Sequence, residues 1–421
     1  MELEQVFSRP ATLTKLRSGP LGSLLDGYCA WLLKRGFSRH TIWTLLEHIS
    51  HLNEYLSRQK VAAGHHLCST EIAEFHESYP SWCQCRGPLE AHLVRVRYSV
   101  NRFVEYLIAM ELFDQLPQHE IHQPLLDAYL AWMASHQYAA AETLEHRAKY
   151  LITFLRWLGP KATSQSLASL TQDDVEKFFL AYAQKVGGAA RQSMQAALRT
   201  FFRFCLYQGN IHAPLDFAVP SLRTYRLTSV PHGLQDAEAQ RVLQGINRKT
   251  LVGRRDYAIL QLLYTYGVRG GQVRALRLEQ IDWARNQILF EPSKRGKASL
   301  LPLTPEVGES LLDYLQNSRY PSQYPQVFLT MHAPYQPLLR ANALTAIVER
   351  KIRAVGIETP SKGSHVFRHA FATRMLQKGH PLKAIADVLG HRCLRTTSIY
   401  AKVDFNSLRQ VPLDWPEEVP L

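Results

Sequence analysis

The sequence predicts a mainly α-helical protein with a small antiparallel β-sheet in its C-terminal half. Apolar residues recur at three- and four-residue spacing along most of the chain, which is the pattern of amphipathic helices. Three short runs, at residues 287–291, 299–303 and 326–329, instead predict strands. Part of the N-terminal half is repeated, and this predicts tandem helical domains ahead of a mixed C-terminal domain.

The internal repeat has a constant offset of 101 residues at its start. Residues 24–31 recur as residues 125–132, with six of the eight positions identical. Further on, residues 103–107 correspond to residues 202–206. Each copy has the pattern of about four amphipathic helices. The sequence therefore predicts a helical domain over residues 1–118 and a second copy over residues 119–212.

A segment with several prolines follows the second copy. Residues 213–233 include Pro214, Pro220 and Pro231, a composition that suits an extended linker. A third domain is expected over residues 234–403, followed by a tail at 404–421 with Leu413 and Trp415.

The charge balance indicates a polyanionic partner. The 421 residues include 49 Lys and Arg against 36 Asp and Glu, a net charge of +13. A surplus of this size is typical of proteins that displace counterions from nucleic acid. No apolar run is long enough to span a bilayer and no signal-like N-terminus is present, so no membrane association is expected. The cysteines show no disulfide-framework pattern, which fits a reducing cytoplasm.

Two motifs in the C-terminal domain gather groups that act on phosphate esters. Residues 364–373 place His365 and Arg368 three apart, on one edge of a helix start. In residues 389–400, Tyr400 lies nine positions after His391. A tyrosine hydroxyl is both a fair nucleophile and a good leaving group, and fixed cations beside it can stabilise a phosphorane without a metal.

Helix start and stop signals place these motifs on short helices. Ser364 is the expected N-cap of a helix that Gly379 ends, and Pro381 opens a helix that Gly390 ends. An earlier helix is expected to end at Gly267. The residues expected to face the core are Leu260, Leu263, Tyr264, Phe367, Phe371, Met375, Leu382, Ile385 and Leu389.

Together these motifs resemble the tyrosine recombinase, or phage integrase, family, with a Xer-like catalytic domain. The family's first motif, T-G-x-R-x-x-E-L, matches residues 266–273, and its β-hairpin lysine matches Lys294. Its H-x-L-R-H-x-F-A-T motif matches residues 365–373, and its L-G-H…T-T-x-I-Y motif matches residues 389–400. The resemblance implies a catalytic set of Arg269, Lys294, His365, Arg368, His391 and Tyr400.

The resemblance also implies a role for each residue and a function. Tyr400 would attack a DNA phosphodiester and form a 3′-phosphotyrosyl ester, while Arg269 and Arg368 grip phosphate oxygens. His391 would donate to a phosphate oxygen, Lys294 would protonate the leaving sugar oxygen, and His365 would assist with the Tyr400 proton. The expected function is site-specific DNA recombination by metal-independent cleavage and rejoining, with no cofactor.

Two departures from the family pattern keep alternatives open. The family usually has an acid three residues after its first arginine, where this chain has Gln272, and Gly270-Gly271 stands where a helix should begin. An inactivated recombinase that only holds or bends DNA is one alternative, and a type IB topoisomerase is another. The sequence leaves open the target site and the choice between integration, excision, dimer resolution and transposition.

The expected partners are double-stranded DNA and further copies of the chain, as a tetramer on two sites, with related recombinases or accessory proteins. The second helical copy resembles the family's core-binding domain. The extra first copy would contact either DNA or protein, and the apolar tail would dock on a neighbouring protomer or in cis. The doubled N-terminal domain and the tail resemble those of recombinases carried by mobile elements. The expected location is the cytoplasm, in association with the nucleoid. The basic residues expected on DNA are Arg199, Arg223, Arg226, Arg295 and Lys297.

A zinc site is weighed and not predicted. Cys83 and Cys85, with Cys68 and the pair His65-His66 upstream, offer zinc-type ligands. The single residue between the two cysteines departs from the two-to-four-residue spacing of structural zinc sites. The expectation is therefore that no metal is bound.

Overall fold

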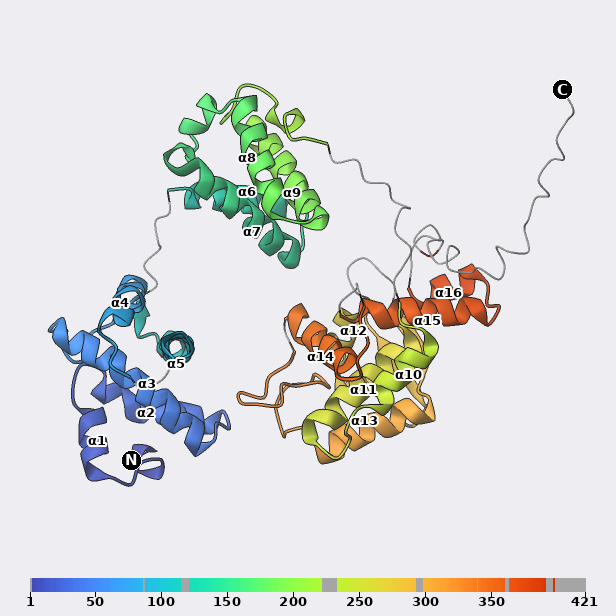
Figure 1. The fold of residues 1–421 in the computed structure, drawn as a ribbon, viewed down its shortest axis with the longest axis horizontal. Helices are drawn as coiled ribbons and strands as arrows, with labels where there is room; N and C mark the ends of the chain where they lie inside the picture. Colours follow the sequence, from blue (N-terminus) through green and yellow to red (C-terminus); the bar gives the residue numbers. More distant parts are fainter. Residues whose placement is uncertain are drawn as a thin grey trace, which may run out of the picture. The chain divides into compact units, whose positions relative to one another are not determined.

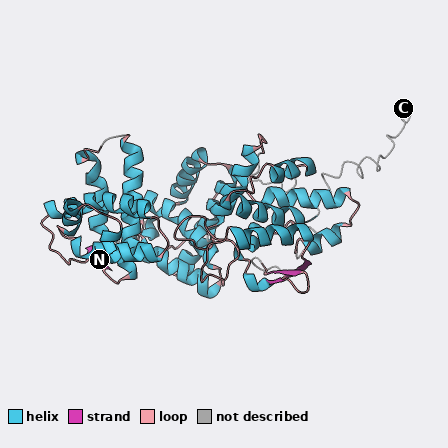
Figure 2. Cartoon of the chain, turned by 90° about the horizontal axis from the view of Figure 1, so that it is seen from below, coloured by secondary structure: helices cyan, strands magenta, loops and turns pink. Residues whose placement is uncertain are grey.

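The computed structural model describes residues 2–85, 88–114, 121–221, 233–292, 298–338, 340–359, 363–390 and 397. Helices make up most of this part of the chain, and its strands are short (Figure 2). The prediction of a mainly α-helical fold with a small antiparallel sheet is confirmed. Within these ranges, no helix is long and apolar enough to cross a bilayer.

The chain divides into two compact units. One consists of Met1–His65, Cys85–Tyr106 and Arg226–Leu421, and the other of His66–Gln84 and Leu107–Tyr225. Each unit therefore combines segments that are distant in the sequence. The expected domain boundaries after residues 118, 212, 233 and 403 remain predictions.

The two repeated segments contain helices in the same order. In the first, the elements are α1 (Pro10–Arg17), α2 (Gly22–Lys34), α3 (Arg39–Arg58), β1 (Leu67–Cys68), α4 (Ser69–Trp82), α5 (Leu89–Ala109) and β2 (Phe113–Asp114). In the second they are α6 (Gln123–His136), α7 (Ala141–Leu158), α8 (Gln172–Lys185) and α9 (Gly188–Tyr207). Helices α2 to α5 thus correspond in order to α6 to α9. Short 3₁₀ turns lie at Glu2–Gln5, Gly159–Lys161, Ser166–Ser169 and Leu215–Phe217.

Equivalent aromatic contacts recur in the two segments. The buried ring of Tyr28 on α2 packs edge-on against Phe103 of α5, with ring centroids 5.0 Å apart. The buried ring of Tyr129 on α6 packs edge-on against Phe201 of α9 at 5.6 Å. These contacts pair Phe103 with Phe201, so the sequence-based pairing of Phe103 with Phe202 is wrong by one residue. Both Phe201 and Phe202 are buried, and apolar character alone does not fix this register.

The C-terminal domain is organised around the helix α11 (Leu251–Tyr266). This helix packs against α13, α15, α10 and α12, which together bury most of its sides (Figure 1). A helix covered on most sides needs apolar residues around most of its circumference. Leu260 and Leu263 are fully buried, as predicted. The remaining helices are α10 (Asp236–Gln244), α12 (Gly270–Ala275), α13 (Pro305–Asn317), α14 (Ala341–Ala354), α15 (His365–Gln377) and α16 (Leu382–Val388), with a 3₁₀ turn at Leu278–Gln280.

A buried ion cluster fixes α11 against α14. The carboxylate of Asp256 is fully buried and lies 2.7 Å from Arg255 Nη2 and 3.1 Å from Lys351 Nζ. A buried carboxylate needs such partners because desolvation disfavours its charge. The cluster is therefore a structural feature of this domain.

The small sheet consists of β3 (Ile281–Asp282), β4 (Gln287–Phe290) and β5 (Ser299–Pro302), in that spatial order. Both neighbouring pairs are antiparallel, with Ile288 opposite Ile281 on one side and Leu301 on the other. The predicted strands at 287–291 and 299–303 are thus confirmed as β4 and β5.

The third predicted strand, at residues 326–329, is wrong. This segment makes isolated bridges from Gln326 to Arg277 and from Leu329 to Pro337, and β3 takes the third place in the sheet. Side chains occupy its backbone groups: Arg319 donates to the carbonyls of Gln326 and Val327. The Tyr314 hydroxyl accepts from the N–H of Leu329. An apolar run can therefore be buried without pairing as a strand.

Candidate active site

Two arginines of the predicted catalytic set meet at one backbone carbonyl. Arg269 is the N-cap residue of α12, and Arg368 lies in the first turn of α15. Arg269 Nη1 donates to the carbonyl oxygen of Leu389 at 3.5 Å, and Arg368 Nη2 donates to the same oxygen at 2.7 Å. Three segments that are distant in the sequence thus meet at Leu389, two residues before His391.

Arg368 is buried and bonded to two backbone carbonyls. The residue is only 4% exposed, and Nη1 makes a second bond, of 2.9 Å, to the carbonyl oxygen of Gly267. Carbonyl oxygens orient a guanidinium plane but carry no formal charge. A carboxylate would orient the plane and also neutralise its charge. These two bonds therefore make Arg368 a fixed cation suited to a phosphate.

Glycine at position 267 allows this arrangement. Gly267 ends α11 in the left-handed conformation, with φ of +59°. A Cβ at this position would lie 2.6 Å from Cδ1 of Phe371 on α15. Both the backbone angle and the close approach require glycine. The predicted helix stop at Gly267 is confirmed, and it also supplies the carbonyl that Arg368 contacts.

His365 is exposed at the start of α15, one turn before Arg368. Residues three apart on a helix lie on one side of it, so His365 belongs to the same edge as the arginine. Ser364 occupies the N-cap position as predicted, but it has helical backbone angles and makes no capping hydrogen bond. The predicted N-cap position is therefore confirmed, without a side-chain capping bond.

Gln272 has a role that its sequence position did not reveal. Its side chain is 7% exposed, its Oε1 accepts from the backbone N–H of Arg269 at 3.1 Å, and its Nε2 donates to the carbonyl oxygen of Glu291 at 3.0 Å. The first bond caps α12. The second joins α12 to Glu291, which directly follows β4 and lies three residues before Lys294 in the sequence. An ionised carboxylate at this position could accept the first bond but could not donate the second.

Gln272→Glu is expected to destabilise the C-terminal domain at pH 7 by about 1–3 kcal/mol, the usual cost of leaving a buried polar group unsatisfied. A carboxylate keeps the bond from Arg269 but faces the Glu291 carbonyl with no hydrogen to donate. Urea unfolding measures the loss. Gln244→Glu is the matched control, since Gln244 is exposed in the last turn of α10 in the same domain. A Gln272→Glu protein as stable as the parent would contradict this role.

The glycine pair after Arg269 also has a structural explanation. A Cβ on the buried Gly270 would lie 2.5 Å from Ser364 Oγ and 2.7 Å from Leu344 Cδ2. Glycine here lets α12 lie directly against the start of α15. Gly271 has no such neighbour, since the nearest atom to its Cβ position is Arg274 Nη2 at 4.0 Å. Of the two glycines, Gly270 is therefore the one that close packing requires.

Tyr266 lies in the same region but is a poor nucleophile. Its hydroxyl donates to the carbonyl oxygen of Pro302 at 2.6 Å and accepts from the backbone N–H of Thr304 at 3.2 Å. Burial raises the pKa of this phenol, so its anion is disfavoured. Tyr266 thus fastens α11 to the end of β5 as a neutral hydrogen-bonding group.

Several predicted residues lie outside the described ranges. They are the catalytic candidates Lys294, His391 and Tyr400 and the DNA-contact candidates Arg223, Arg226, Arg295 and Lys297. Between His391 and Tyr400, Thr397 is described and is fully buried. The assignment of these residues to the site remains a prediction.

Arg199 is described, and it makes contacts within its own unit. Its Nη2 donates to the carbonyl oxygen of Val219 at 2.9 Å and to Ser221 Oγ at 2.8 Å. These bonds fix the segment after Leu215–Phe217 against α9. The predicted DNA contact of Arg199 remains a prediction.

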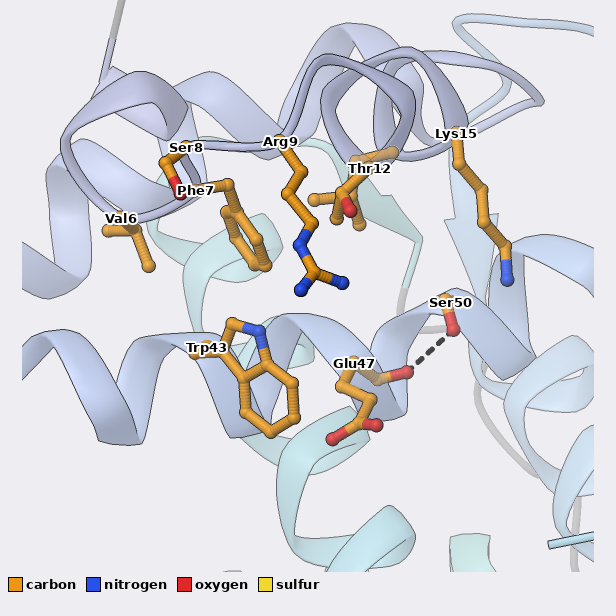
Figure 3. Close-up of a pocket in the computed structure, with 10 residues that line it drawn as sticks. Val6, Phe7, Ser8, Arg9, Thr12, Lys15, Trp43, Glu47 and Ser50 are labelled. Atoms are coloured by element: carbon orange, nitrogen blue, oxygen red, sulfur yellow. Dashed lines mark hydrogen bonds between the residues drawn. The ribbon is translucent and has the colours of Figure 1, made fainter.

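A pocket of about 520 Å³ lies among the N-terminal helices (Figure 3). Arg9 points into it toward Trp43 and Glu47, and Lys15 contributes a second cation (Figure 3). Of the predicted catalytic residues that the structure describes, Arg269, His365 and Arg368, none lines this pocket.

Comparison with known proteins identifies the family. The model of the phage integrase family matches residues 233–407. The putative integrase/recombinase y4rA of Sinorhizobium fredii is 38% identical over 60% of this chain, and the match spans 61% of that relative. The putative integrase/recombinase y4rF of the same organism is 28% identical over 98% of this chain and 96% of its own length. Tyrosine recombinase XerD of Lacticaseibacillus casei is 32% identical over 59% of this chain and 84% of its own length.

A solved structure shows the same fold. The crystal structure of a lambda integrase (75–356) dimer bound to a COC′ core site superposes with a TM-score of 0.52 at 17% identity, covering 70% of this chain and 99% of that one. The fold, the paired arginines and the sequence matches agree. The chain belongs to the phage integrase, or tyrosine recombinase, family, and it is an enzyme of the integrase/recombinase class.

Proposed function

We propose that this chain recombines DNA site-specifically, by cleaving and rejoining strands through a 3′-phosphotyrosyl intermediate at Tyr400. The observation that carries the proposal is the convergence of Arg269 and Arg368 on the Leu389 carbonyl, two residues before His391. Two guanidinium groups held at one point suit a phosphate that gains charge during attack.

The chemistry consists of two transesterifications. The Tyr400 oxygen attacks phosphorus, the bond to the 5′ sugar oxygen breaks, and a phosphotyrosyl ester forms. A 5′ hydroxyl from another strand then attacks this ester and releases the tyrosine, so the number of phosphoester bonds is conserved and no ATP is needed. Arg269 and Arg368 neutralise the phosphorane, His391 donates to one of its oxygens, and Lys294 protonates the leaving sugar oxygen.

His365 assists proton transfer at the Tyr400 hydroxyl. Its ring is exposed at the start of α15, while Arg368 one turn later is buried. An exposed histidine can reach a bound substrate, whereas the buried arginine is fixed by its bonds to backbone carbonyls. Acid–base catalysis of this kind typically contributes about 10²–10⁴-fold.

Double-stranded DNA is the proposed substrate, with a tetramer on two sites as the active assembly. The net charge of +13 supports a polyanionic partner. The lambda integrase structure is a dimer bound to a core site. The residues proposed to contact DNA are Arg199, Arg223, Arg226, Arg295 and Lys297.

An inactivated DNA-binding recombinase is the main alternative, and two observations weigh against it. Gln272 and Gly270 were the departures that suggested lost activity. Gln272 caps the helix that begins at Arg269, and Gly270 permits the contact between that helix and α15. Both residues thus support the arginine geometry instead of weakening it.

The test is covalent trapping on nicked duplexes tiled across the DNA that flanks the gene, in EDTA. A nick lets the released strand diffuse away, so the cleaved protein–DNA ester accumulates. The protein is expected to form an adduct that survives a denaturing gel, and Tyr400→Phe is expected to form none. Tyr320→Phe, a change at an exposed tyrosine of the same domain, should behave like the parent.

Other outcomes separate the alternatives. A mobility shift on native gels without an adduct on any tile would favour the inactivated binder. Relaxation of supercoiled plasmid without sequence preference would favour a type IB topoisomerase. Either result would overturn the proposed recombinase activity.

A further inference from the structure

A cluster of two histidines and one cysteine lies in the N-terminal helices, and the proposed recombination chemistry does not use it. His51 is on α3, His92 is on α5, and Cys85 precedes α5 in the chain. Their nitrogen and sulfur atoms all lie within 4.8 Å of one another. All three residues belong to the same compact unit.

The distance between Cys85 and His51 matches that between two ligands of a tetrahedral metal ion, and His92 lies within 4.8 Å of both. Cys85 Sγ lies 3.5 Å from His51 Nε2, and the rings of His51 and His92 are 5.6 Å apart between centroids, at 81° to each other. Zinc–sulfur and zinc–nitrogen bonds of about 2.3 Å and 2.0–2.1 Å place tetrahedral ligand atoms about 3.5 Å apart. The cluster therefore needs little movement to coordinate an ion.

The neighbouring histidine His48 is not one of these three residues. His48, one turn before His51, is occupied differently: its Nδ1 lies 2.9 Å from Ser99 Oγ. Three segments thus bring three ligand-type atoms within 4.8 Å of one another, next to His48 in the same helix bundle.

The other cysteines in this region lie elsewhere. Cys83 Sγ donates to the Tyr79 hydroxyl at 3.3 Å, and Cys68 Sγ lies 2.9 Å from Thr70 Oγ1. Within the described ranges, His51, Cys85 and His92 are the group of metal-ligand side chains found close together. The ligand set weighed from sequence, with Cys83 beside Cys85, therefore differs from the set that the fold assembles.

We propose that His51, Cys85 and His92 bind one divalent cation of the zinc type. Two imidazoles and a thiolate are the ligands that zinc and cobalt prefer over calcium or magnesium. Cys85 is exposed and the histidines are half-buried, so an ion can enter from solvent and water can take a fourth position. The ion would link α3 to α5 and to the segment before α5.

The test uses the full chain, reduced and freed of metal by EDTA that is then removed. Titration with Co²⁺ is expected to produce a thiolate-to-cobalt charge-transfer band that saturates at one equivalent. Zn²⁺ should abolish the band, and one equivalent of Zn²⁺ should raise the melting temperature, because a ligand that binds only the folded state stabilises it.

Single substitutions identify the ligands. Cys85→Ser should remove the charge-transfer band, and His92→Asn should weaken Co²⁺ binding by more than about 100-fold, since even outer-shell changes cost 10–100-fold. Cys83→Ser is the matched control, two residues from Cys85, and should bind Co²⁺ as the parent does. Circular dichroism of the metal-free variants checks that each is folded, and His51→Asn replaces either variant that is not.

Three results would overturn the proposal. One is a parent protein that binds less than one equivalent of Co²⁺. Another is a folded Cys85→Ser variant that retains the band. The third is a Cys83→Ser variant that loses it. DNA cleavage at Tyr400 does not enter these measurements, so failure of the metal site and failure of the proposed recombinase activity are distinguishable.

Discussion

Arg368→Ala is expected to slow DNA cleavage by about 10²–10³-fold or more, the usual effect of removing one preorganised donor from a developing negative charge. Arg368 is 4% exposed and holds the carbonyls of Gly267 and Leu389 together. Its removal takes away a phosphate ligand and leaves both carbonyls without this partner. Single-turnover cleavage of the nicked duplex, at saturating protein, measures the effect.

Two companion variants distinguish catalysis from folding. Arg368→Lys keeps the charge but lacks the planar fork, so it should remain folded and still cleave far more slowly than the parent. Arg353→Ala removes an exposed arginine of α14 that pairs with Glu349, and it should cleave at the parent rate. An Arg368→Lys protein with the parent's cleavage rate would contradict the assigned role.

Gly270→Ala is expected to reduce cleavage by about 10²-fold, the typical cost of misplacing a catalytic group by 1 Å. Its Cβ would lie 2.5 Å from Ser364 Oγ and 3.1 Å from Ser364 Cβ, and because rotation of the hydroxyl relieves only the first contact, α12 is expected to shift away from α15. Arg269, the adjacent residue, would move with it. Overpacking of this kind should also cost about 1–3 kcal/mol of stability, measured by urea unfolding.

Gly271→Ala is the matched control for this prediction. The space around position 271 is open, and alanine is the better helix former by about 0.5–1 kcal/mol. Gly271→Ala should therefore be at least as stable as the parent and cleave at a similar rate. Equal losses in the two variants would show that the contact with Ser364 is unimportant.

The sequence was a good guide to helices and to the order of the site motifs. Gly267, Gly379 and Gly390 end helices as predicted, because glycine reaches left-handed angles without strain. Arg269 and Arg368 converge because the motifs that contain them begin helices packed on the same central helix, α11. Patterns of helix start and stop are local, so they can be predicted from a single sequence.

The features that were missed depend on distant contacts. The sequence-based interpretation of Gln272 considers only the negative charge that a glutamate would have there. In the structure its side chain donates to a carbonyl 19 residues away. The run at 326–329 has the composition of a strand, but the side chain of Arg319 binds its carbonyls. Cys85 has Cys83 as its neighbour in sequence and His51 and His92 as its neighbours in space.

The most direct test of the proposed mechanism is to identify the residue that becomes attached to DNA. The trapped complex, formed in EDTA, is digested with nuclease and protease, and the peptide that retains a nucleotide is sequenced by mass spectrometry. A single modified peptide is expected, with the phosphate on Tyr400. Attachment to Tyr266, or to any residue other than Tyr400, would contradict it, as would a reproducible failure of the folded protein to form an adduct on DNA that it binds.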